Sequence, residues 1–84
     1  MKIVRTENRQ SLINRLKRVE GQVRAVQNML EHNDECADVA TQLSACRSAI
    51  EHTLGAFVAC AIEESCAQSK KDSAEVKRLL KLVI

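Results

Sequence analysis

The stretch from residue 34 to residue 69 constrains this chain more than any other. It contains no proline and a single glycine, Gly55, and its side chains repeat at a fixed interval. Two series recur every seven positions, the second three positions out of phase with the first: Cys36, Leu43, Ile50 and Phe57, and then Val39, Cys46, Thr53 and Cys60. This spacing is typical of a helix that packs lengthwise against other helices.

A helix over residues 34–69 would be about 50 Å long at the rise of an α-helix. The two seven-residue series would form an apolar stripe along this helix. A chain of 84 residues is too short to cover that stripe by itself. The stripe therefore predicts a partner, most simply a second copy of the chain. Three of the four cysteines lie on the stripe, so we expect any thiol chemistry at a seam between helices or between subunits.

A second helix is predicted over about residues 6–32, with Thr6 or Asn8 as its N-cap. Its apolar residues alternate at spacings of four and three: Leu12, Leu16, Val19, Val23, Val26 and Leu30. Gly21 lies in the middle of this helix, where glycine costs about 1 kcal/mol relative to alanine and often marks a close approach of two backbones.

The remaining boundaries follow from short polar segments. Asn33 and Asp34 are expected to cap the long helix at its start. Residues 68–72 form a second break, and a short helix over residues 73–83 begins at Ser73. The sequence thus predicts an all-α fold of three helices (about 6–32, 34–69 and 73–83) in one domain over residues 1–84.

The net charge of +2 conceals a strong segregation of charge. Residues 1–30 hold seven basic and two acidic side chains, residues 31–69 hold one basic and seven acidic, and residues 70–84 hold five basic and two acidic. A basic first segment favours a polyanionic partner. Because Phe57 is the one aromatic residue, stacking on single-stranded bases is disfavoured and double-stranded DNA is the better candidate.

The cysteines are expected to be reduced thiols. No apolar run is long enough to span a membrane, and the first ten residues lack the apolar core of a signal peptide, so we expect a soluble, cytoplasmic protein without a membrane partner. The cysteine spacings are 10, 14 and 6, without a CxxC pair, which argues against a structural zinc site.

No catalytic motif is present, and we expect no enzyme.

Cys36 is the best candidate for a reactive thiol. It falls in the first turn of the long helix, where backbone N–H groups favour a thiolate, although Glu35 and Asp38 oppose this. Packing as a small apolar residue is the competing interpretation, and it is favoured for Cys46. Cys66, near the helix end, is expected to be more exposed.

Four segments give the chain a recognisable pattern: NRLKRVEGQV at 14–23, MLE at 29–31, CADV at 36–39 and TQLSA at 41–45. They resemble the signature of the CsoR/RcnR/FrmR family of small bacterial transcriptional repressors, and the resemblance extends over about residues 8–82. Members of that family respond to metal ions, formaldehyde or persulfides.

The resemblance implies an assembly and a DNA-binding face. It implies antiparallel dimers that form four-helix bundles and pair into a disc-shaped homotetramer, which binds double-stranded operator DNA through basic residues on its faces. Arg15 matches a DNA-contacting position of the family, and Lys17 and Arg18 lie in the same segment. A copper-sensing relative carries an arginine where this chain has His52, and we infer that Arg47 takes part of that role.

The effector site is where this chain departs from the family. Cys36 matches the sensing cysteine. Copper sensors add a His and a Cys at positions that are Ala61 and Ser65 here, and nickel and cobalt sensors place His at both. Formaldehyde sensors carry an N-terminal Pro, whereas residue 2 here is Lys. Persulfide sensors carry a second Cys 29 residues beyond the first, and the nearest here are Cys60 and Cys66.

These departures favour a thiol sensor without a resident cofactor. In this hypothesis a small reactive inducer, a persulfide or polysulfide before another electrophile, modifies Cys36, and Cys60 or Cys66 of a partner subunit acts as the resolving thiol. Three alternatives remain open: a repressor that responds to copper, nickel or another transition metal ion through a rearranged ligand set that includes Cys36, a formaldehyde-responsive repressor, and a helical adaptor that docks an acidic protein.

Overall fold

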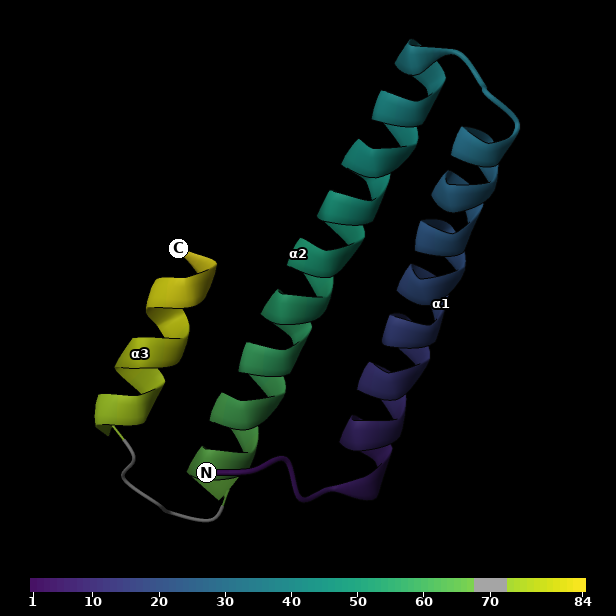
Figure 1. Cartoon of the computed structure of the whole chain (residues 1–84). Helices are drawn as coiled ribbons and strands as arrows, with labels where there is room; N and C mark the ends of the chain where they lie inside the picture. The colour runs from purple at the N-terminus through teal and green to yellow at the C-terminus, as the bar shows by residue number, and fades with distance from the viewer. Residues whose placement is uncertain (68–72) are drawn as a thin grey trace.

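Three helices make up the computed structural model, which describes residues 1–67 and 73–84. They are α1 (Thr6–Glu31), α2 (Cys36–Ala67) and α3 (Ser73–Val83), and the described residues contain no strand. α1 and α2 run antiparallel as a hairpin, and α3 lies beside the second half of α2 (Figure 1). The all-α class and the three predicted helices are confirmed.

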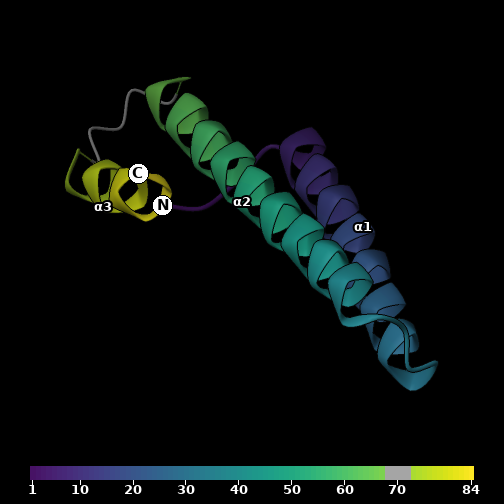
Figure 2. The same cartoon turned by 90° about the horizontal axis from the view of Figure 1, so that it is seen from above.

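The molecule is one helix thick. Its principal extents are 52 × 26 × 12 Å, and 12 Å is the diameter of a single helix with its side chains. The view from above shows α2 between α1 and α3, and the chain before α1 crossing toward α3 (Figure 2). Domains usually bury their apolar faces between at least two layers of secondary structure, and this chain provides one layer.

One row of each long helix is buried inside the hairpin. The row on α1 consists of Leu12, Val19 and Val26, and the row on α2 consists of Val39, Cys46 and Thr53. Cys46 is 5% exposed and clusters with Val26 and Val39. The packing role predicted for Cys46 is therefore confirmed.

The second row of each long helix is exposed. These six side chains, the unpaired rows, keep 40–63% of their surface in contact with solvent: Leu16, Val23 and Leu30 on α1, and Leu43, Ile50 and Phe57 on α2. The heptad pattern of α2 is therefore only half satisfied within the chain. α1 covers the row that contains Cys46, and the row that begins at Cys36 is left uncovered.

The turn between α1 and α2 differs from the prediction. Asn33 adopts a left-handed backbone conformation with φ 57°, and its N–H donates to the Leu30 carbonyl (3.1 Å) while the Asp34 N–H donates to the Met29 carbonyl (3.0 Å). This pair of bonds is a Schellman motif, which ends a helix. Asn33 and Asp34 therefore close α1. α2 begins at Cys36, with the Glu35 carbonyl accepting from the Val39 N–H (3.1 Å).

The start of α1 also differs from the prediction. Arg5 is the N-cap residue and makes no side-chain capping bond, so neither Thr6 nor Asn8 fills that position. α3 begins at Ser73 as predicted. The break at 68–72 and the predicted end of the long helix at residue 69 lie outside the described residues. None of the described helices is long and apolar enough to cross a membrane.

Candidate effector site and DNA-binding face

Cys36 is the first residue of α2 and is exposed. It lines a shallow groove of about 290 Å³ together with residues of the helix turn and of both apolar rows: Leu30, Asn33, Asp34, Val39, Ala40 and Leu43. The thiol thus sits at the open end of the unpaired rows, where a small molecule, a metal ion or a second chain can reach it.

Ala61 and Ser65, which match family effector positions, lie at the opposite end of α2 and are buried, at 4% and 7% exposed. Ala61 faces a cavity of about 140 Å³ whose other walls come from the first three residues and from α3: Met1, Lys2, Ile3, Phe57, Glu75 and Leu79. A methyl group and a hydroxyl are not the soft ligands that Cu(I) selects, nor the imidazoles that suit Ni(II).

The other thiols are far from Cys36 within one chain. Cys60 is partly buried and Cys66 is exposed, and both belong to the same continuous helix as Cys36. At 1.5 Å per residue, Cys60 and Cys66 are roughly 36 and 45 Å along the helix axis from Cys36. A disulfide requires Cα atoms within about 7 Å. Any bridge to Cys36 must therefore come from another subunit. The described residues contain no cluster of metal-binding side chains within one chain.

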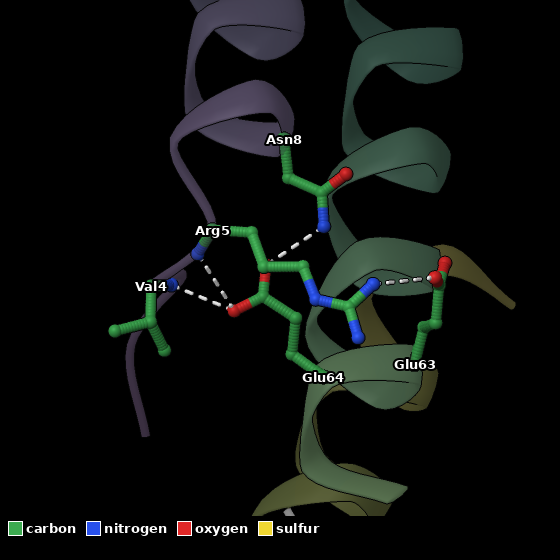
Figure 3. Close-up of polar contacts among 5 residues, drawn as sticks. All are labelled: Val4, Arg5, Asn8, Glu63 and Glu64. Carbon is green, nitrogen blue, oxygen red and sulfur yellow. Dashed lines mark hydrogen bonds and ion pairs between the residues drawn. The ribbon is translucent and has the colours of Figure 1, made fainter. Parts of the chain in front are cut away.

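A buried carboxylate ties the start of the chain to α2. Glu64 is 2% exposed and accepts three hydrogen bonds, from the backbone N–H groups of Val4 (2.7 Å) and Arg5 (3.2 Å) and from the side-chain amide of Asn8 (2.7 Å; Figure 3). The carboxylate therefore supplies, from α2, the acceptor that no side chain of α1 provides at its N-terminus.

The same contacts fix the electrostatics of this end. The Asn8 amide, then the Val4 and Arg5 N–H groups, hold the pKa of Glu64 below its ordinary value. The Arg5 guanidinium bonds the neighbouring Glu63 (3.3 Å), and the amino group of Met1 lies 3.6 Å from a Glu75 carboxylate oxygen. Residues 1–5, the N-terminal arm, are thereby held to both α2 and α3.

Sequence reasoning missed Glu64. One signal was present: Glu64 continues the seven-residue series of Cys36, Leu43, Ile50 and Phe57, so an acidic residue occupies an apolar position of the stripe. An acidic side chain at such a position needs hydrogen-bond donors. The pattern could have flagged the residue, but it could not have identified the Val4 and Asn8 donors.

Two of the predicted DNA-binding residues share a groove. Arg15 and Arg18 line a groove of about 470 Å³ on α1 with four polar side chains: Glu7, Gln10, Ser11 and Asn14. Lys17 is exposed but is not among the residues that line it. Adjacent helix positions lie 100° apart around the axis, so Lys17 lies on a different face of α1 from Arg18.

Arg47 and His52 are both exposed on α2. They are five residues apart, which places them about 140° apart around the helix axis, and the Arg47 guanidinium donates to the Ser44 hydroxyl (3.4 Å). The two residues therefore lie on different faces of α2, and their predicted roles stay predictions.

The sequence profile of a family described as "Metal-sensitive transcriptional repressor" matches residues 8–84. The chain belongs to this family. Membership confirms the predicted family, whose members are transcriptional repressors and not enzymes. The DNA-binding role of Arg15 and Arg18 and the effector role of Cys36 stay predictions.

Two curated relatives are similar over part of their length. The copper-sensing transcriptional repressor CsoR of Bacillus subtilis (strain 168) is 43% identical over 47 residues, which is 56% of this chain and 46% of the relative. The copper-sensing transcriptional repressor RicR of Mycobacterium tuberculosis is 47% identical over 45 residues, 54% of this chain and 47% of the relative. The chain thus spans about half the length of these relatives. No solved structure matches.

Proposed function

We propose that this repressor binds operator DNA as an oligomer and is released by an effector that acts at Cys36. The observation that carries the proposal is the position of this thiol. Cys36 is exposed at the start of α2, in a groove that continues into the unpaired rows. An effector bound there would touch the surface on which two copies pair, and would thereby bias the geometry of the assembly.

A second copy supplies the missing layer. Ile50 is the middle residue of the row Leu43, Ile50 and Phe57 on α2, and these side chains are 40–53% exposed. An antiparallel pairing with Ile50 at the twofold axis would set Leu43 against the partner subunit's Phe57. The same pairing would bring Cys36 close to the far end of the partner's α2. This arrangement supports a homodimer with two equivalent effector sites, and two such dimers would form the tetramer.

The favoured effector is a thiophilic metal ion, with Cu(I) first. Both curated relatives are copper-sensing repressors, and a thiolate is a ligand type that selects Cu(I). Ala61 and Ser65 do not fit as ligands, so the standard set is incomplete. The thiols near that end of α2 are Cys60 and Cys66, and we propose that one of them completes the site with the partner's Cys36.

A second candidate is covalent modification of the thiol, favoured by the same absence of ligands at positions 61 and 65. The Cys36 thiolate would attack the terminal sulfur of a polysulfide, break its S–S bond and become a persulfide, while a polysulfide shorter by one sulfur leaves. A thiol of the partner, Cys60 or Cys66, would then attack Cys36, form an intersubunit disulfide and release hydrogen sulfide. Two thiols are oxidised, and the sulfane sulfur is reduced to sulfide.

DNA binding by the reduced protein, measured by fluorescence anisotropy on its own promoter duplex, separates these effectors. Cu(I), polysulfide and formaldehyde are added in turn, and intact mass is recorded after each. We expect Cu(I) to release the DNA without a covalent change. Release by polysulfide with a crosslinked dimer would favour the second candidate, and release by formaldehyde alone would replace both.

Two cysteine variants identify the site. Cys36→Ala should bind DNA and fail to respond, whereas Cys46→Ala, which removes a thiol inside the hairpin, should respond like the wild type. If Cys36→Ala is still released by the same effector, the proposed site is wrong. Binding should also weaken log-linearly with salt and favour the promoter over random DNA. Loss of that preference would support an adaptor instead.

A further inference from the structure

The groove that contains Arg15 and Arg18 is built for more than phosphate. Its six lining residues all come from the first four turns of α1 and recur at spacings of three and four: Glu7, Gln10, Ser11, Asn14, Arg15 and Arg18. All six are exposed, and none belongs to the row of α1 that packs on α2. They form one continuous polar strip along α1.

Two residues of this strip, Gln10 and Asn14, carry amide side chains one helical turn apart, and these are bonded to each other. The Gln10 amide nitrogen donates to the Asn14 amide oxygen at 3.0 Å. This bond orients the Asn14 amide before any ligand arrives, which reduces the entropy lost on binding. It uses one of the two lone pairs on the Asn14 oxygen. The second lone pair can accept a hydrogen bond and the Asn14 amide nitrogen can donate one. The Asn14 amide therefore suits a ligand that both donates and accepts.

Phosphate matches only the two arginines of this strip. Phosphate oxygens only accept hydrogen bonds, so the Glu7 carboxylate and the Asn14 oxygen would repel them. A base edge does match, because adenine presents a donor at N6 beside an acceptor at N7 in the major groove, and an asparagine amide pairs with both. The major groove of DNA is wide enough to admit an α-helix such as α1.

We propose that Asn14 reads an adenine in the major groove of the operator and that Gln10 is its positioning residue. The proposal rests on the proposed function, that the chain binds an operator duplex. Within it, Arg15 and Arg18, which follow Asn14 on the same helix, contact phosphates and fix the position of α1, and Asn14 supplies sequence preference. The tetramer would present one such strip from each chain.

Selection from a random-sequence duplex pool tests the proposal, because the pool itself yields the preferred site. The reduced wild-type protein is used first, and then Asn14→Ala, Gln10→Ala and Arg18→Ala. Asn28→Ala, an exposed amide on α1 outside the groove, is the matched control. Circular dichroism verifies that each variant keeps its helix content. In the selected duplex, each adenine is then replaced in turn by 7-deazaadenine, which lacks the N7 acceptor.

We expect one adenine in each half-site at which 7-deazaadenine weakens wild-type binding by roughly 5- to 150-fold, the range for a bidentate base contact. Asn14→Ala should be insensitive to that replacement and should lose the preference for this adenine, and Gln10→Ala should weaken the preference in part. Arg18→Ala should weaken binding to selected and random duplexes equally and reduce the salt dependence by about one phosphate. Asn28→Ala should behave like the wild type.

Two results would overturn the proposal, and they are distinguishable. If Asn14→Ala selects the same motif and shows the same sensitivity to 7-deazaadenine as the wild type, Asn14 reads no base, and the proposed repressor function is unaffected. If the wild-type protein selects no sequence at all, operator recognition itself fails, and the proposed function fails with it. The 7-deazaadenine scan on the wild type needs no variant and holds even if a substitution disturbs the helix.

Discussion

Glu64 is a buried carboxylate whose hydrogen-bond donors are all uncharged groups. Its three donors are two backbone N–H groups and the Asn8 amide, and the nearest guanidinium, that of Arg5, hydrogen-bonds to Glu63 instead. Such a group needs every donor, because a buried charge that loses a partner is costly. Residue 64 therefore holds the N-terminal arm and the first turn of α1 in place.

The stability that Glu64 provides should depend on pH. Its pKa is lowered in the folded chain, chiefly by the Asn8 amide. The contribution is therefore fully present above the ordinary value of 4.5 and is lost as the pH falls through the lower folded pKa. We expect Glu64→Gln to be less stable than the wild type at pH 7 and the difference to shrink below pH 4.5. Urea unfolding at pH 7, 4.5 and 3 measures this.

Glu63→Gln is the control for that experiment. Glu63 is adjacent in sequence but exposed, with an ion pair to Arg5 at 3.3 Å, and exposed pairs contribute at most about 1 kcal/mol. The two variants remove the same charge from neighbouring positions. If Glu64→Gln loses no more stability than Glu63→Gln at pH 7, the buried hydrogen bonds do not hold the arm.

At the scale of the element, the left-handed Asn33 ends α1. Its φ of 57° costs most residues about 1–2 kcal/mol, whereas asparagine tolerates it and glycine adopts it freely. We expect Asn33→Ala to lower the free energy of unfolding by about 1 kcal/mol and Asn33→Gly to leave it equal or higher. Urea titrations of the three proteins decide this, and equal values for the Ala and Gly variants would show that the turn does not constrain α1.

Gly21 lies inside α1 with no close neighbour. A Cβ added there would meet no atom within 4 Å, so nothing within the chain explains the glycine. Gly21→Ala should raise the free energy of unfolding by about 1 kcal/mol through helix propensity alone. Gly55→Ala, at an equally open position of α2, is the comparison. A loss of stability with Gly21→Ala alone would reveal a second copy packed against α1 at that point.

The helices could be predicted because the residue spacing that specifies them is local in the sequence. The contacts between the helices could not be predicted in this way. Seven-residue spacing placed both long helices, since a helix repeats its faces every 3.6 residues. The same spacing could not show which row α1 would cover, because Val39 and Leu43 are equally apolar. The predicted caps of α1 and α2 were wrong for a related reason. Asn33 suits either a helix start or a helix end, and the acceptor for the start of α1 lies 60 residues away at Glu64.

At the scale of the whole molecule, the proposed effector site is divided between two copies of the chain. The position of Cys36 and the missing ligands at Ala61 and Ser65 could be predicted from a family pattern. The partner of Cys36 could not be predicted, because the proposed pairing brings the two ends of α2 together only between two copies. A chain 12 Å thick has no second layer of its own, so its stability and its effector site should both depend on assembly.

Ile50 tests that dependence because it is the middle residue of the unpaired row on α2. It is 51% exposed in the single chain, so Ile50→Glu should cost little if the chain is a monomer. In an antiparallel dimer the substitution would bury two carboxylates against each other at the twofold axis, which like-charge repulsion and desolvation forbid. We expect sedimentation to give the single-chain mass for this variant, with promoter binding weakened at least about tenfold because the phosphate contacts are no longer shared.

Ile13→Glu provides the matched control. Ile13 is similarly exposed, at 44%, but lies off the rows that face a partner. Its substitution adds the same charge to the surface without entering the proposed interface, so the oligomeric mass should be unchanged. If Ile50→Glu keeps the oligomeric mass while Ile13→Glu loses it, the copies pair through the outer face of α1 instead. Cys36 would then lie away from the subunit interface, and an effector there could not release DNA by the pairing mechanism.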